Sequence, residues 1–202
     1  MEKQKSCEFG VKSGNSRGTA ARSKISTQDM VLCGVFTTLI AVGAFIKVPV
    51  PVVPFTLQFL FTMLAGLLLG GRKGALSVGV YILLGLVGLP VFAEGGGFWY
   101  ILKPSFGYLL GFMLAAYVTG RMVERKGRLS TGWVMAVNFL GLFIVYAAGM
   151  IYYYVICNYV IDTPIAIGPL FLYCFVLAVP GDICLCILAA ILTVRVRPVF
   201  QR

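Results

Sequence analysis

Long apolar runs alternate with short polar or glycine-rich segments along most of this chain. A helix that crosses a lipid bilayer needs about 20 predominantly apolar residues. The second and fourth runs are short and contain glycine, as expected where helices pack around a cavity and neighbours cover backbone that ends inside the bilayer. The pattern predicts an all-α integral membrane protein with six transmembrane helices, over residues 30–46, 55–70, 75–92, 106–119, 133–160 and 170–194.

The positions of lysine and arginine predict how these helices are oriented. With six helices, the segment before residue 30, residues 71–74, residues 120–132 and the segment after residue 194 share one side of the membrane. All but two of the 17 basic residues lie in these segments, and only Lys47 and Lys103 lie on the other side. Because cytoplasmic loops carry the excess of lysine and arginine, we expect both termini to be cytosolic.

Composition narrows the classes of function. Hydrophobic residues make up 59% of the chain and charged residues 12%, whereas soluble domains have about 25% charged residues. The net charge of +10 follows from the topology, so no nucleic-acid partner is expected. The sequence has no histidine, no CxxC pair and no GxxxxGK[ST] loop. We therefore expect no metal, no cofactor, no catalytic residues and no ATPase activity of its own.

The chain divides into three parts by composition. Residues 1–29 are rich in Ser, Gly, Lys and Arg and predict a flexible cytosolic tail. Residues 30–194 form the predicted six-helix membrane domain, and residues 195–202 a short basic cytosolic C-terminus.

Asp182 is the acid placed well inside a predicted helix, residues 170–194. A charged group near the middle of a bilayer costs about 3 kcal/mol on insertion scales, so such groups usually face a cavity or a partner. The functional interpretation is a ligand-binding carboxylate. The structural alternative is a hydrogen bond to Asn138, Gln58 or a carbonyl freed beside Pro180.

The predicted outward segment 94–105, EGGGFWYILKPS, joins flexible glycine backbone, three aromatic residues and one cation. Such a segment fits the wall of a small-molecule site, with Lys103 pairing with a ligand carboxylate. The alternative is a belt of aromatic side chains at the membrane surface, with Lys103 extending to the headgroups.

Two further patterns suggest contacts with other molecules. Pro49, Pro51 and Pro54 make the first outward connection stiff, which fits either a gating loop over a site or a rigid hairpin. Small residues recur at about four-residue spacing, a pattern that lets helices approach closely. Most of these ridges are expected to pack within the chain, whereas the ridge in the first helix could contact another membrane subunit through Gly34, Thr38 and Ala41.

Several segments occur in one order and at separations that resemble a known family. They are IAVGAFI at 40–46, PVVPFTLQ at 51–58, LAGLLLG at 64–70, LLGLVGLPVF at 83–92, PSFGYLLGF at 104–112 and VPGD at 179–182. Together they resemble the BioY family, the biotin-binding S components of energy-coupling factor (ECF) transporters. The resemblance covers residues 30–194 and implies an ECF S-component-like bundle in the cell membrane. Its implied partners are membrane lipid, an ECF transmembrane T subunit and two ATPase subunits.

The predicted substrate-binding residues are Asp182, Lys103, Tyr108, Ser105, Gly95 and Gln58. Two of them depart from the family pattern, since Lys103 stands where the family has a glycine and Gly95 where it can have an asparagine. Asp182 matches the aspartate that binds the ureido nitrogens of biotin in this family. Where the family has a lysine three residues later, this chain has Leu185; Phe106 and Leu109 are further departures. We hypothesise that Lys103 supplies the missing cation.

Four functions follow as alternatives. The first is capture of biotin from outside for an ATPase-driven module. The second is the same role for another small acid, such as dethiobiotin or lipoate. The third is a stand-alone proton-coupled carrier or intramembrane enzyme that uses Asp182 as a relay or base. The fourth is a scaffold that joins membrane proteins through its glycine ridges.

Overall fold

The computed structural model describes residues 26–48, 55–126, 129–161, 166, 168 and 179–200. Within these residues the chain forms an α-helical bundle with one short 3-10 helix, η1 (Phe98–Leu102), and one antiparallel pair of two-residue strands, β1 (Lys47–Val48) and β2 (Phe55–Thr56). Six α-helices are described, in agreement with the six predicted from the sequence. They are α1 (Thr27–Phe45), α2 (Gln58–Leu69), α3 (Gly71–Leu86), α4 (Phe106–Glu124), α5 (Thr131–Tyr159) and α7 (Val179–Phe200).

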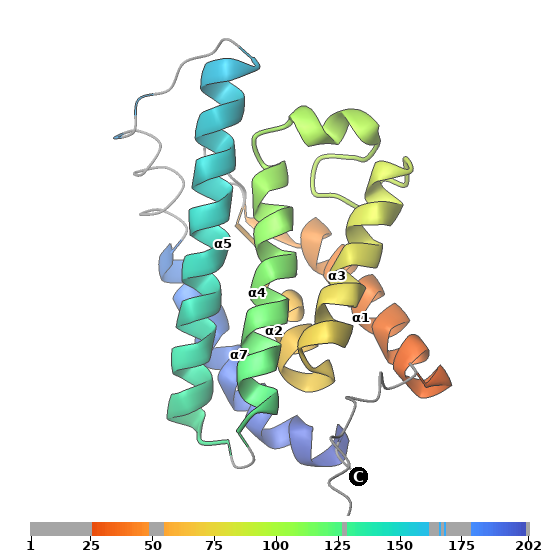
Figure 1. Cartoon of the computed structure of the whole chain (residues 1–202), viewed down its shortest axis with the longest axis vertical. Helices are drawn as coiled ribbons and strands as arrows, with labels where there is room; N and C mark the ends of the chain where they lie inside the picture. The colour runs from red at the N-terminus through yellow and green to blue at the C-terminus, as the bar shows by residue number, and fades with distance from the viewer. Residues whose placement is uncertain are drawn as a thin grey trace, which may run out of the picture.

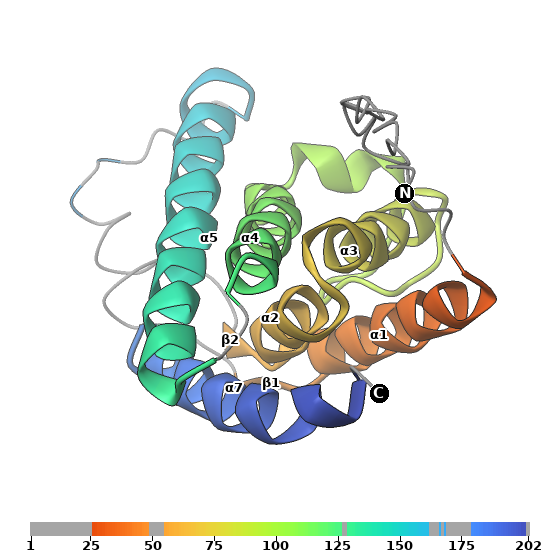
Figure 2. The ribbon, with the colours of Figure 1, turned by 60° about the horizontal axis from the view of Figure 1, so that its bottom comes forward.

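Four of these helices are long and apolar enough to cross a membrane: α1, α4, α5 and residues Val179–Pro198 of α7. The short helix α2 lies in the middle of the bundle, where it contacts α1, α3, α4 and α7 (Figure 2). Nine of its twelve residues are buried. Because its neighbours cover it on most sides, α2 can end inside the bundle without exposing its backbone ends to lipid.

Gly70 joins α2 directly to α3. It closes α2 and precedes the first residue of α3, with a φ of 89°. A residue with a side chain is strained at this φ, whereas glycine adopts it readily. The chain therefore reverses direction between two helices without an intervening loop.

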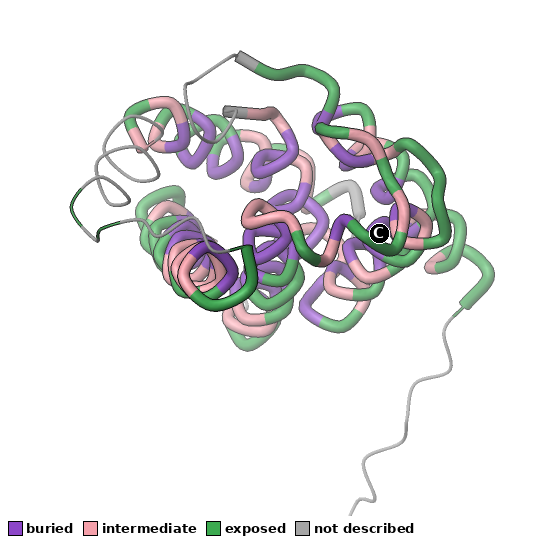
Figure 3. Tube along the Cα trace, turned by 90° about the horizontal axis from the view of Figure 1, so that it is seen from above, coloured by how far each residue is buried: buried purple, intermediate pink, exposed green. Residues whose placement is uncertain are grey.

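Glycines on α4 allow close packing against α5, as the small-residue spacing predicts. A Cβ atom added to Gly111 would lie 3.0 Å from the Cα atom of Val145, and one added to Gly107 would overlap the side chain of Tyr152. The inward faces of the helices are buried and the outer faces exposed (Figure 3). An exposed apolar outer face is what a bundle in lipid requires.

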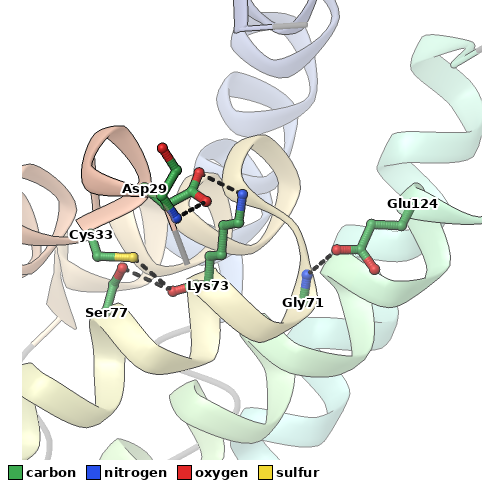
Figure 4. A network of polar contacts seen from close by, with 7 residues as sticks. Asp29, Cys33, Gly71, Lys73, Ser77 and Glu124 are labelled. Carbon is green, nitrogen blue, oxygen red and sulfur yellow. Dashed lines mark hydrogen bonds and ion pairs between the residues drawn. The ribbon is translucent and has the colours of Figure 1, made fainter. Parts of the chain in front are cut away.

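The helix ends that carry most of the described basic residues gather at one end of the bundle. The start of α1, the α2–α3 junction, the α4–α5 connection and the end of α7 all lie toward the lower end of Figure 1. Polar contacts tie this end together: Lys73 forms an ion pair with Asp29 at 2.5 Å, and Glu124 accepts a hydrogen bond from the Gly71 backbone at 3.0 Å (Figure 4).

Several predicted helix boundaries differ from the structure. α1 begins at Thr27, so Asp29, assigned to the tail from composition, lies in its first turn. The predicted short fourth helix, 106–119, extends to Glu124. The third was predicted to reach residue 92 but ends at Leu86, because Gly88 adopts a φ of 115° and Pro90 has no backbone N–H to continue a helix. Of the sixth predicted helix, residues 170–178 lie outside the described residues.

Candidate functional site

Asp182 lies between α5 and α7 and is buried, with 8% of its surface exposed. Its Oδ2 atom accepts a hydrogen bond from the Tyr146 hydroxyl at 2.5 Å. Its Oδ1 atom accepts none from the described residues. The predicted structural partners Asn138 and Gln58 do not bind it. Within the described part of the chain, the carboxylate is thus held at one oxygen, and no group donates to the other.

A second polar contact fixes α5 against α7. Asn138 Nδ2 donates to the backbone carbonyl of Cys186 at 2.9 Å. Cys186 lies one turn beyond Asp182, and Asn138 lies two turns before Tyr146, so the contacts follow the antiparallel run of the helices. The side chain that could have paired with the acid instead sets the register that brings Tyr146 to it.

Tyr108 extends this arrangement to α4. Its ring meets the Tyr146 ring edge-on, with centroids 6.1 Å apart at 89°. It also lies over Gly149, where an added Cβ atom would be 2.5 Å from a ring carbon. We call Tyr108, Tyr146 and Asp182 the helix group. Two of its members were predicted from the sequence; Tyr146 was not, because nothing in the sequence separates it from the other tyrosines of α5.

A second group lies in the segment between α3 and α4, at the upper end of Figure 1. Lys103 Nζ forms an ion pair with Glu94 Oε2 at 3.1 Å, donates to the Glu94 carbonyl at 3.2 Å, and lies 5.0 Å from the centroid of the Tyr100 ring. Ser105 Oγ donates to the Tyr100 hydroxyl at 3.4 Å. We call Glu94, Gly95, Tyr100, Lys103 and Ser105 the outer-loop group. Burial raises the pKa of the Tyr100 hydroxyl, which therefore remains protonated.

The glycines of this segment hold a defined turn and do not form the flexible backbone expected from the sequence. The Gly97 N–H donates to the Gly85 carbonyl at 2.7 Å, and Phe92 and Gly95 exchange two backbone hydrogen bonds. Gly95 has a φ of 108°. Phe92 is 1% exposed, and its ring centroid lies 4.4 Å from that of Tyr100. This buried ring contact stabilises the turn.

The three consecutive aromatic residues of this segment divide between two roles. Tyr100 is buried, whereas Phe98 and Trp99 are 69% and 78% exposed. Phe98 and Trp99 therefore fit the prediction of an aromatic belt at the membrane surface, and Tyr100 fits the prediction of a binding-site wall.

Gln58 is buried at the start of α2, and its Nε2 atom has no hydrogen-bond acceptor in the described part of the chain. Its side chain interacts with Tyr81, whose ring packs edge-on against Phe92. This chain of contacts connects Gln58 to the outer-loop group.

The gating-loop residues Pro49, Pro51 and Pro54 lie outside the described residues. The segments on either side of them pair as antiparallel strands, with Lys47 opposite Thr56. Lys47 Nζ also donates to the Ala93 carbonyl at 3.1 Å. The connection therefore starts and ends beside the outer-loop group.

The first-helix ridge faces away from the bundle at two of its three positions. Gly34 and Thr38 are exposed, and a Cβ atom added to Gly34 would meet nothing within 4 Å. Ala41 is half-buried and packs against the core. Gly34 and Thr38 are thus two small, exposed positions on α1, which the described part of the chain does not cover.

Comparison with known proteins identifies the family. Residues 17–202 match the model of the BioY family. The chain belongs to the BioY family. A probable biotin transporter BioY of Lysinibacillus sphaericus is 48% identical over 87% of this chain and 90% of its own length. The biotin transporter BioY of Thermotoga maritima is 40% identical over 84% of this chain and 96% of its own length.

The fold agrees with this membership. The crystal structure of the S component for biotin from an ECF-type ABC transporter matches with a TM-score of 0.70 and 26% identity. The match covers 85% of this BioY chain and 91% of that structure. The resemblance to an ECF S-component bundle, proposed from sequence segments, is confirmed.

Proposed function

We propose that this BioY protein is the substrate-binding subunit of a biotin uptake transporter in the cell membrane, with no ATPase of its own. It captures biotin from outside and passes it inward together with a T subunit and two ATPase subunits. Both termini and the basic end of the bundle face the cytosol. The observation that carries the proposal is the similarity, over nearly the whole chain, to relatives named biotin transporters and to an S component for biotin.

The two groups of the site correspond to the two polar ends of biotin. The ureido ring of biotin presents N–H donors, which suit the open oxygen of Asp182 in the helix group. The other end carries a carboxylate, which suits Lys103 in the outer-loop group. Ser105 lies just before α4 and Tyr108 lies in its first turn, where the two groups meet. Gly95 belongs to the outer-loop group, and Gln58 is connected to that group through Tyr81 and Phe92.

Lys103 is engaged by Glu94 in this structure, so a ligand carboxylate has to displace an existing partner. Both side chains are 43% exposed, and exposed ion pairs contribute only about 0.2–1 kcal/mol. Displacement is therefore inexpensive. Binding would exchange one carboxylate for another at the same ammonium group.

Leu185 supports a second candidate substrate. The family pattern that this chain resembles has a lysine at this position, and Leu185 is buried, at 9% exposure. This departure from the family pattern lies within one turn of Asp182 and leaves dethiobiotin and lipoate, a small acid without ureido N–H groups, as alternative substrates.

Thermal unfolding of purified protein in detergent, with each of the three acids, tests the proposal. A ligand at 100 times its dissociation constant stabilises the folded state by about 2.7 kcal/mol. We expect biotin and dethiobiotin to raise the unfolding temperature and lipoate to leave it unchanged. A rise with lipoate alone would assign a different substrate, and no rise with any of them would refute the proposed function.

The exposed small residues Gly34 and Thr38 on α1 provide the test for the coupling module. Gly34→Leu adds a side chain where the described part of the chain offers no obstacle, so biotin binding should persist while co-purification with the T subunit and ATPases is lost. Gly132→Leu is the matched control, since an added Cβ atom there also meets nothing within 4 Å. Equal co-purification of both variants would remove α1 from the proposed contact.

A further inference from the structure

Tyr146 and Asp182 form a pair whose geometry is set before any ligand arrives. A 2.5 Å distance between a hydroxyl and a carboxylate oxygen is in the range of short, charge-assisted hydrogen bonds. Both residues are buried, at 4% and 8% exposure. Water competes little for either group at this depth, so the bond determines which carboxylate oxygen remains available.

The tyrosine is itself held in place. Its ring is met edge-on by Tyr108, and the register of its helix is fixed by the hydrogen bond from Asn138 to the carbonyl of Cys186. The hydroxyl cannot move away from Asp182 without disturbing these contacts. A recognition group held in its binding orientation avoids the entropy cost of ordering it when the ligand binds.

We propose that Tyr146 is a positioning residue for substrate recognition, which occupies Oδ2 of Asp182 and presents Oδ1 to an N–H donor of the ligand. The inference rests on the proposed function and assigns to it a residue that acts through Asp182. A ligand with an N–H group at this point gains a hydrogen bond to a charged acceptor. A ligand that presents sulfur or an apolar edge there leaves a buried carboxylate oxygen unpaired, which is costly.

The pair therefore acts as a specificity element for the ureido ring. Biotin and dethiobiotin both carry ureido N–H groups, whereas lipoate carries a disulfide ring. Lys103 binds the carboxylate that all three share. Discrimination among these acids is assigned to the helix group, and attraction of the carboxylate to the outer-loop group.

The test compares Tyr146→Phe with the unmodified protein in binding of biotin and of two biotin analogues, each methylated at one ureido nitrogen. We expect Tyr146→Phe to weaken biotin binding about tenfold, equivalent to about 1.4 kcal/mol. With the analogue whose N–H to Asp182 is blocked, the same substitution should change affinity less than about twofold, because the interaction it positions is already absent.

The matched control is Tyr152→Phe, on the same helix. It removes a hydroxyl group that donates a hydrogen bond to the Ile101 carbonyl at 2.5 Å. Its effect should be the same for biotin and for both analogues. Thermal unfolding without ligand measures how far each variant is destabilised.

A second variant keeps the test decisive if Tyr146→Phe is poorly folded because it leaves the buried acid unpaired. In a protein that already carries Asp182→Asn this charge is absent, and adding Tyr146→Phe, which frees the amide oxygen, should cause no further loss of biotin affinity. Equal losses for biotin and both analogues, or a full Tyr146→Phe effect on top of Asp182→Asn, would overturn the positioning role. Failure of the unmodified protein to bind biotin would instead refute the proposed function.

Discussion

Asp182 and Glu94 are acids in two regions of one proposed site, and their surroundings differ. Asp182 is buried between two helices and is paired with a neutral hydroxyl, whereas Glu94 is 43% exposed on a loop and is paired with the ammonium group of Lys103. A hydrogen bond to a charged group contributes about 1.5–3 kcal/mol, whereas an exposed ion pair contributes about 0.2–1 kcal/mol. The buried pair can therefore decide which ligand binds, and the exposed pair can open at little cost.

The largest effect is expected from Asp182→Asn. The amide keeps a similar shape, and its single oxygen can still accept from Tyr146. It carries no charge, and its NH2 group, which is a donor, then faces the ligand N–H, so biotin affinity should fall about 100-fold. Equilibrium binding of labelled biotin measures it.

Asp29→Asn is the matched control for this change. It neutralises an acid that pairs with Lys73 at the basic end of the bundle, so affinity should remain within about twofold. Similar losses of biotin affinity in both variants would mean that the burial of Asp182 does not distinguish its role from that of Asp29.

An intermediate effect is expected from Lys103→Ala, which removes the cation assigned to the ligand carboxylate. Biotin affinity should fall about three- to tenfold, because the cation is partly exposed and screened by water. Binding of biotinol, which has an alcohol in place of the carboxylate, should not change. If Lys47→Ala gives this pattern and Lys103→Ala does not, the carboxylate is bound by the other cation of the outer end.

A smaller effect of opposite sign is expected from Glu94→Gln. The substitution removes the competitor for Lys103 and should raise biotin affinity about two- to threefold at low salt. The gain should shrink at high salt, where exposed charges are screened. A loss of affinity on this substitution would instead make Glu94 a direct ligand contact.

The smallest effect is expected from Trp99→Ala. Its ring is 78% exposed on the outer loop, so biotin affinity should stay within about twofold. Tyr100→Ala is the comparison, since that neighbouring ring is buried against Phe92, and it should reduce both stability and affinity. A large loss of biotin affinity in Trp99→Ala would indicate that this residue belongs to the binding site and not to the membrane surface.

The outer segment was predicted only in part from its residue types. Glycines, aromatics and a cation indicated a binding wall or a membrane-surface belt, and the structure divides the aromatics between these two uses. From the sequence, the glycines indicated a flexible backbone. Their φ angles and backbone hydrogen bonds, which only the structure gives, show that they form a defined turn. The ion pair from Lys103 to Glu94 spans nine residues and depends on that turn.

Hydropathy and charge were sufficient to predict the six described helices and their approximate positions, because long apolar runs favour helices in a bilayer and charged residues mark the ends of these runs. They also singled out Asp182, since an acid in hydrocarbon is costly whatever surrounds it. That Tyr146 rather than Asn138 binds this acid became clear only from the packed helices. The choice depends on the register between α5 and α7, which is set by contacts between side chains far apart in the chain and leaves no trace in local sequence pattern.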